Sequence, residues 1–285
     1  MNQPAAGGKR VFITGAGSGL GKALALRFAR DGWRVACTDL ALASVEQTLA
    51  EVRAAGGDGL AAVCDVTSEE SFAAVAARLK AEWGGVDVLV NNAGVATKGT
   101  VEEASIEQWQ WVLNINLLGC VRGARAVIPL MTAQGSGHIV NIASFAGIAN
   151  PPAMASYNAA KAAVISLSES LRHEMEPHGV GVSVACPSFF KTNLVANSRA
   201  GAHLDSDEPA PQMDRIVQRL MEKSAFTADN VADYIFDAVQ TKKFLVLASA
   251  DDRRQVLIKR ASPEWYFKLV QKSTEKFMQR RKQGG

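Results

Sequence analysis

Residues 11–30 read VFITGAGSGLGKALALRFAR and predict a strand, a glycine-rich turn and a helix in direct succession. A short β-branched run comes first, and the segment after the turn has apolar residues at helical spacing. Glycine allows the turn to bend tightly and a ligand to approach its backbone. Free amides at the start of a helix attract anions, so this joint is a candidate pyrophosphate site. The turn residues expected to bind the pyrophosphate are Gly15, Ser18, Gly19, Leu20 and Gly21.

The turn departs from the strict G-x-G-x-x-G fingerprint because Leu20 stands where the third glycine would be. Taken alone, it could be only a tight joint. The second expected strand supports the binding interpretation, since it ends at Asp39, near the position of the ribose-binding acid in such units. A carboxylate there accepts hydrogen bonds from ribose hydroxyls and repels a 2′-phosphate, which favours NAD over NADP. Lys22 leaves NADP open, and an aspartate that merely turns the end of a strand is the alternative.

The rest of the chain repeats this alternation of short strands and Ala-rich helices, which is typical of βαβ units in a parallel sheet. The strands are almost continuously apolar, so helices should cover both faces of the sheet. The predicted fold class is α/β, a doubly wound Rossmann fold with a mainly parallel seven-stranded sheet. The expected strands are 11–14, 34–39, 60–64, 86–91, 138–143, 180–186 and 244–248. The expected helices are 20–31, 43–55, 68–83, 105–131, 155–176, 228–240 and 251–261.

The 285 residues are expected to form one catalytic domain over 1–252, with a substrate lid inserted at 188–226 and a basic helical extension over 253–285. The extension holds ten basic and two acidic residues, which the net charge of +3 conceals. Ser262-Pro263 predicts the start of a helix in it. The extension could serve as an oligomer arm, bind an anionic membrane surface or an acidic partner, or be only a solvated surface helix.

Composition excludes several classes of protein. With 48% hydrophobic and 21% charged residues, the chain is neither disordered nor fibrous, and its charge does not suggest a nucleic-acid binder. Its four cysteines lack zinc-site spacing, so we expect no metal and a reducing cytoplasm. The start of the chain is too polar for a signal peptide, and prolines and glycines interrupt the uncharged stretch 126–160. We therefore predict a cytoplasmic protein without an integral membrane segment.

Polar motifs follow the expected strands or begin the helices after them. They are Asp65-Val66, Asn91-Asn92-Ala93-Gly94, Asn116, Ser144, and the pair Tyr157 and Lys161. Open α/β sheets bind their ligands at the carboxyl ends of the strands, so these motifs should share one edge with the glycine turn.

Tyr157 and Lys161 stand four residues apart within an expected helix, so their side chains share one face. A free tyrosine has a pKa of about 10, too high for a base at neutral pH. A cation about 4 Å away is worth roughly 4 kcal/mol at an effective dielectric of 20, which could lower this pKa by up to roughly 3 before desolvation opposes it. We therefore expect Tyr157 to be a general acid/base near working pH.

In order and spacing, these motifs resemble the short-chain dehydrogenase/reductase family over about residues 9 to 192, and more loosely up to 248. The resemblance implies that Asn116, Ser144, Tyr157 and Lys161 form the catalytic tetrad. It also implies a cofactor site that extends beyond the turn to Asp39, Asp65, Val66, Asn92, Gly94, Tyr157, Lys161, Pro187 and Thr192. The N-N-A-G run could instead only pin the central strand. Ser188 is a departure, because the family usually has glycine after the proline.

The functional hypothesis is an NAD(H)-dependent oxidoreductase that interconverts a secondary alcohol and its ketone. Tyr157 would exchange the proton, Ser144 would bind the substrate oxygen, Lys161 would hold the nicotinamide ribose and Asn116 would position a water. Apolar residues in the expected lid suggest a hydrophobic substrate, although a lid needs such residues merely to pack. We expect a homo-oligomer, a tetramer or dimer. The alternatives are an NADPH-dependent carbonyl reductase and a non-catalytic dinucleotide sensor.

Overall fold

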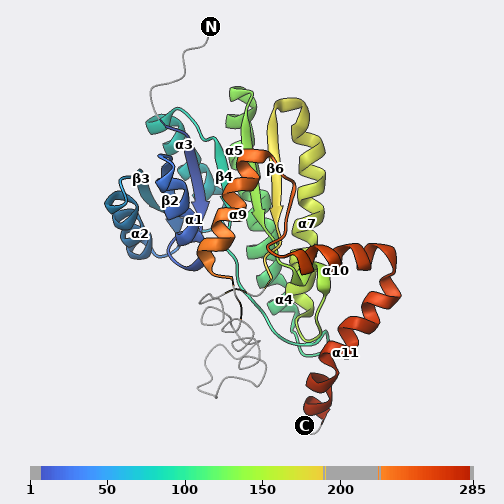
Figure 1. Cartoon of the computed structure of the whole chain (residues 1–285). Helices are drawn as coiled ribbons and strands as arrows, with labels where there is room; N and C mark the ends of the chain where they lie inside the picture. Colours follow the sequence, from blue (N-terminus) through green and yellow to red (C-terminus); the bar gives the residue numbers. More distant parts are fainter. Residues whose placement is uncertain (1–7, 189, 191–223, 225, 283–285) are drawn as a thin grey trace.

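A computed structural model describes residues 8–188, 190, 224 and 226–282, and its centre is one seven-stranded parallel sheet (Figure 1). The strand order is β3-β2-β1-β4-β5-β6-β7, so the direction of winding reverses between β1 and β4. This is the topological switch point of a doubly wound α/β fold, and the predicted fold class is confirmed. The strands are β1 (Arg10–Thr14), β2 (Arg34–Asp39), β3 (Asp58–Val63), β4 (Val88–Asn91), β5 (Gly137–Ile142), β6 (Val180–Ala185) and β7 (Leu245–Val246).

Helices cover both faces of the sheet, each over its own hydrophobic cluster (Figure 1). Successive strand residues point to opposite faces, so Val11 and Ile13 join one cluster and Phe12 the other. The first cluster is covered by α1 (Gly19–Arg30), α2 (Leu42–Ala54) and α9 (Ala228–Thr241). The second is covered by α3 (Glu69–Trp83), α5 (Gly119–Gln134) and α7 (Ala155–Met175).

The helix expected over 105–131 is not continuous. The structure has α4 (Ile106–Leu113), a π-helical turn η1 (Asn114–Leu118) and then α5. A π-turn inserts one residue into a helix, and such turns are frequent at functional sites. The apolar spacing is almost the same with and without the insertion, so the sequence pattern could not indicate it. Two short elements, α6 (Ala146–Ala149) and the 3₁₀ turn η2 (Glu176–His178), complete this half of the fold.

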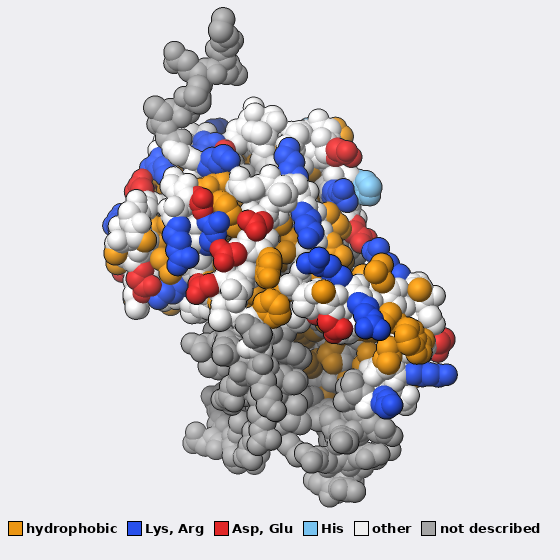
Figure 2. All heavy atoms as spheres, viewed as in Figure 1, with side chains coloured by type: hydrophobic (Ala, Val, Ile, Leu, Met, Phe, Trp, Pro, Cys, Tyr) orange, Lys and Arg blue, Asp and Glu red, His pale blue; other side chains and the backbone are white. Residues whose placement is uncertain are grey.

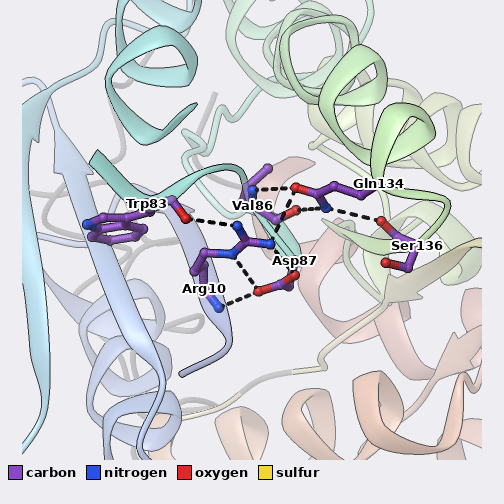
Figure 3. Close-up of polar contacts among 6 residues, drawn as sticks. All are labelled: Arg10, Trp83, Val86, Asp87, Gln134 and Ser136. Atoms are coloured by element: carbon purple, nitrogen blue, oxygen red, sulfur yellow. Dashed lines mark hydrogen bonds and ion pairs between the residues drawn. The ribbon is translucent and has the colours of Figure 1, made fainter. Parts of the chain in front are cut away.

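A hydrogen-bonded network joins the amino ends of the central strands (Figure 3). The Arg10 guanidinium donates to both carboxylate oxygens of Asp87, at 2.7 and 2.8 Å, and to the Trp83 carbonyl at 3.0 Å. The Gln134 amide donates to the Val86 carbonyl at 2.9 Å. The hydrogen bond with Asp87 raises the pKa of Arg10. This network fixes the starts of β1 and β4, at the edge of the sheet opposite the expected site.

Two helices end the described chain, α10 (Ala250–Ala261) and α11 (Pro263–Lys282), which pack on one another. The Ser262 hydroxyl accepts from the Trp265 amide at 3.4 Å, and Pro263 is the first residue of α11, as the sequence predicted. Lys and Arg side chains lie beside hydrophobic ones on this region (Figure 2), where Trp265 and Phe267 are exposed. The boundary expected at residue 252 falls inside α10, and the division of the chain there stays a prediction.

Most of the lid expected over 188–226 lies outside the described residues. Among the helices that the structure describes, none combines the length and apolar character needed to cross a membrane. The four cysteines of the chain are all buried, and none forms a disulfide bond.

Candidate active site

The glycine turn between β1 and α1 leaves no room for side chains at its key positions. Gly15 and Gly19 have φ of +65° and +52°, in the left-handed region that glycine adopts without strain. A Cβ on Gly21 would lie 2.0 Å from the Gly15 carbonyl oxygen, and one on Gly17 would lie 2.2 Å from Ser44 Oγ. The first turn of α1 carries no acidic residue, and Ser18 makes no side-chain cap. The turn therefore exposes backbone amides at a helix start, which fits a pyrophosphate.

Asp39 ends β2 and faces this turn. One carboxylate oxygen accepts from the Gly17 amide at 3.2 Å and the other from the Leu40 amide at 2.7 Å. The carboxylate thus turns the end of the strand and also stands beside the glycine turn, so both interpretations of Asp39 describe part of its contacts. Lys22, which left NADP open, forms an ion pair with Glu51 at 2.6 Å.

Thr14 joins the end of β1 to the loop after β4, a role that the sequence did not predict. Its hydroxyl accepts from the Asn92 and Ala93 amides at 3.0 and 3.1 Å, and the Asn92 side chain donates to the Thr14 and Gly15 carbonyls at 2.9 and 3.1 Å. The position of Thr14, directly before the glycine turn, was the available signal. Asn91 donates to Asn141 at 2.9 Å. These contacts agree with the structural alternative for the N-N-A-G run, which holds β1, β4 and β5 together.

Asp65 and Val66 follow β3 at the same edge. The Asp65 carboxylate accepts from the amide and hydroxyl of Thr67 at 2.8 and 2.7 Å. Val66 is buried, and its carbonyl accepts from Arg122 at 3.1 Å. Both residues are therefore fixed by the chain itself, and their contact with an adenine ring stays a prediction.

The π-turn η1 places Asn116 beside the strand ends. The Asn116 amide donates to the Val95 carbonyl at 2.9 Å, and its oxygen accepts from the Val95 amide at 2.8 Å. Gly94 lies between Asn116 and Lys161, because a Cβ there would be 3.0 Å from Asn116 Oδ1 and 3.4 Å from Lys161 Nζ. Three segments expected at one site thus meet within contact distance.

Tyr157, Ser144 and Lys161 also come together. Tyr157 and Lys161 lie in the first two turns of α7, and both are buried. A hydrogen bond connects Tyr157 with Ser144, which follows β5. The Lys161 ammonium lies 5.8 Å from the centre of the Tyr157 ring and donates to the Ile142 carbonyl at 2.8 Å.

The expected lowering of the Tyr157 pKa by Lys161 is wrong for this structure. Burial raises the pKa of Tyr157 above its ordinary value, and the opposing influence is the hydrogen bond with Ser144. Burial also lowers the pKa of Lys161. Desolvation disfavours the charged form of both groups, and the ammonium is directed at a carbonyl instead of the phenol. Tyr157 is therefore a protonated group at neutral pH.

The loop after β6 completes the edge. The Pro187 carbonyl accepts from the Phe145 amide at 2.9 Å, which joins this loop to the segment that carries Ser144. Ser188, at the position of the expected glycine, donates to Asp252 at 3.2 Å. Thr192 lies outside the described residues. No group of three or more His, Cys, Asp or Glu with metal-binding geometry occurs among the residues that the structure describes.

The family model described as short chain dehydrogenase matches residues 9–203, more than half of the chain. The protein therefore belongs to the short-chain dehydrogenase/reductase family of oxidoreductases, as the motifs predicted. The seven-stranded fold and the strand-edge site agree with this membership.

Two curated relatives and one solved structure align with most of this chain. It is 38% identical over 234 residues to the probable oxidoreductase EphD of Mycobacterium tuberculosis, which covers 82% of this chain and 40% of that protein. It is 40% identical over 191 residues to 2,5-dichloro-2,5-cyclohexadiene-1,4-diol dehydrogenase LinX of Sphingobium indicum, covering 67% of this chain and 76% of that one. A short-chain dehydrogenase/reductase from Burkholderia phymatum in complex with NAD superimposes with a TM-score of 0.82 at 32% identity, covering 92% and 96% of the two chains. The chain spans about 40% of the length of the EphD proteins it matches.

Proposed function

We propose that this protein is an NAD(H)-dependent oxidoreductase that interconverts a secondary alcohol and its ketone, with Tyr157 as the acid/base. The observation that carries the proposal is the buried cluster at one sheet edge. Tyr157 is hydrogen-bonded to Ser144 there, and the Lys161 ammonium lies near the Tyr157 ring. Asn116 holds the loop after β4 through Val95. A purely binding protein has no need for this set of groups.

The choice of NAD rests on the contacts around the glycine turn. The turn leads into a helix start with no acidic residue in its first turn, Asp39 faces it with a carboxylate that would repel a 2′-phosphate, and Lys22 forms an ion pair with Glu51. A solved relative from Burkholderia phymatum holds NAD. The residues proposed to hold the cofactor are Gly15, Ser18, Gly19, Leu20, Gly21, Asp39, Asp65, Val66, Asn92, Gly94, Tyr157, Lys161, Pro187 and Thr192.

Bound NAD supplies the nicotinamide ring that accepts or returns the reducing equivalent. In ketone reduction, Tyr157 donates its phenolic proton to the carbonyl oxygen, a role that suits its raised pKa. In alcohol oxidation, the ionised phenol takes the hydroxyl proton. Ser144 donates a hydrogen bond to the same oxygen and stabilises its developing charge. Lys161 supplies positive charge beside the tyrosinate once that anion forms.

Asn116 stabilises the loop that borders the site. Both polar atoms of its side chain bind the Val95 backbone, so it fixes the loop after β4 next to Gly94 and Lys161. This leaves the expected water relay through Asn116 as a prediction, and the water would have to bind another atom of the π-turn.

An apolar substrate is supported by the surroundings of Tyr157. Its ring packs in a cluster with Ala96 and Val112, and Trp111 and Met154 lie against that cluster. A hydrophobic ketone or alcohol would keep water from the phenol. A cytoplasmic location and a homotetrameric or dimeric assembly stay predictions, and analytical ultracentrifugation tests the assembly.

A panel of secondary alcohols and ketones, with steroid-like, aryl and short aliphatic members, tests the proposal. Each is assayed by absorbance with NAD and NADP in parallel. Turnover with NAD preferred is the expected result. A tenfold preference for NADP would favour the carbonyl reductase and contradict the role of Asp39. Silence across the panel together with measurable NAD binding would favour the sensor.

A further inference from the structure

Ser188 connects the candidate active site to the C-terminal helix α10. Its hydroxyl donates to Asp252 Oδ2 at 3.2 Å, although the two residues stand 64 positions apart in the sequence. Asp252 is only 5% exposed. The loop after β6 is thus attached to a buried carboxylate that comes from outside the sheet.

The Asp252 carboxylate depends on few donors. The oxygen that receives Ser188 also accepts from the Ser249 amide at 3.1 Å, while the Asp252 amide donates to Ser249 Oγ at 2.9 Å in a capping box. In the part of the chain that the structure describes, no lysine or arginine pairs with Asp252. A buried charge needs hydrogen bonds, and the start of α10 favours a negative group. The Ser188 hydroxyl is therefore one of two donors to this carboxylate oxygen among the described residues.

The same loop contacts the segment that carries Ser144. Its Pro187 carbonyl accepts from the Phe145 amide at 2.9 Å, and Phe145 directly follows Ser144. Val256 of α10 packs in one hydrophobic cluster with Cys186. A continuous set of contacts thus runs from α10 through residues 186–188 to the catalytic serine segment.

We propose that Asp252 is a positioning residue, which acts through Ser188 to hold the loop of residues 186–188 against the segment that carries Ser144. This inference rests on the proposed function, because it assigns Ser144 to the reaction. The contacts of Asp252 described above are to Ser188 and Ser249, so its role is to position and not to react. Its effect is on geometry, and a displacement of about 1 Å at reacting groups can cost about 10²-fold in rate.

The first test compares Ser188→Ala, Asp252→Ala and their double variant in steady-state kinetics. Each single variant should lower kcat by about tenfold, because the loss falls on the geometry of the serine segment. The double variant should be no worse than either single one, since both remove the same contact. Asp252→Asn keeps an oxygen that can accept both hydrogen bonds, so it should restore kcat.

The second test needs no turnover. Hydrogen exchange of the Phe145 amide in the full-length, cofactor-free protein should be about tenfold faster in Ser188→Ala and Asp252→Ala than in the parent, because this amide donates to the positioned loop. Ser249→Ala is the matched control, since it weakens the cap of α10 and leaves the Ser188–Asp252 bond in place. Unchanged exchange in the first two variants, or equally fast exchange in Ser249→Ala, would overturn the proposal. If no alcohol is turned over by the parent, the proposed function fails and the exchange result alone decides this inference.

Discussion

The two edges of the parallel sheet both carry polar groups, half-buried at the amino edge and buried at the carboxyl edge, and these groups have different partners. At the amino edge, Arg10 and Asp87 are joined by three hydrogen bonds, and Gln134 completes the network (Figure 3). At the carboxyl edge, Tyr157 and Lys161 are buried, and the described contacts include no ion pair between them. Desolvation raises the pKa of Tyr157 and lowers that of Lys161, so it favours the neutral form of both.

This difference separates stability from chemistry. At the amino edge, Arg10 pairs with Asp87, and this interaction stabilises the starts of β1 and β4. Under the proposed function, groups at the carboxyl edge stay available for chemistry, because their partners are backbone atoms and a hydroxyl. Changes at the two edges should therefore have opposite signatures in unfolding and in kinetics, and the following predictions test that separation.

The largest effect is expected for Tyr157→Phe. Removing the phenolic hydroxyl removes the proton donor and acceptor, so kcat should fall about 10²–10⁴-fold. Tm should stay close to the parent, because the ring keeps its packing. Steady-state assays and thermal unfolding measure both. Turnover within about tenfold of the parent would show that Tyr157 is not the acid/base.

The pH profile comes next, because burial and the charge of Lys161 would shift the Tyr157 pKa in opposite directions. Burial raises this pKa above its ordinary value. Alcohol oxidation needs the ionised phenol, so below that pKa kcat/KM should rise about tenfold per pH unit, with no plateau between about pH 7 and 9. Ketone reduction uses the protonated phenol and should stay flat there.

Initial rates in both directions measure this profile, with Tyr234→Phe on α9 as the control that should leave it unchanged. An oxidation plateau reached near neutral pH would instead support the lowering by Lys161 that the sequence predicted.

At the glycine turn, Gly21→Ala should weaken NAD binding. The added Cβ would lie 2.0 Å from the Gly15 carbonyl oxygen. Overpacking costs about 1–3 kcal/mol, which is up to about 100-fold in affinity if the bound geometry carries it. Titration calorimetry measures the affinity. Gly135→Ala is the control, since a Cβ there meets nothing within 4 Å and its φ of +67° adds only local strain. Equal NAD affinity in the two variants would contradict a backbone-built cofactor site.

A smaller change is expected for Asp39→Ser, which removes the carboxylate but keeps a hydrogen-bonding group. The ratio of kcat/KM with NAD to that with NADP should fall about tenfold, because a hydrogen bond to a charged acceptor contributes about 1.5–3 kcal/mol. Asp31→Ser, at an exposed ion pair with Arg27, serves as the charge-matched control. An unchanged ratio would mean that Asp39 only turns the end of β2.

The smallest kinetic effect belongs to the amino edge. Asp87→Ala should leave KM and kcat unchanged but lower stability by about 2 kcal/mol, because it removes hydrogen bonds to a charged group. That corresponds to a Tm roughly 4–8 °C lower. Asp58→Ala breaks the more exposed pair with Arg34 and should cost at most about 1 kcal/mol. A kinetic defect in Asp87→Ala with unchanged Tm would break the separation between the edges.

Much of the fold could be predicted because its signals are local. The strand at 34–39 and the helix at 228–240 match β2 and α9 to within one residue, since β-branched runs and helical spacing are visible along the chain. The π-turn at Asn116 could not be predicted, because one inserted residue hardly changes the apolar pattern. The Tyr157 pKa was expected with the wrong sign, because burial is a property of the whole fold.

The sequence by itself determined the family, the α/β class and the positions of the chemical groups, because each motif occupies a fixed place relative to a strand end. Tertiary structure decided what those groups contact. It directed Lys161 to the Ile142 carbonyl and joined Ser188 to Asp252 across 64 residues. The physical reason is that propensity and periodicity act between near neighbours in the chain, whereas desolvation and long-range hydrogen bonds exist only once the chain has closed around them.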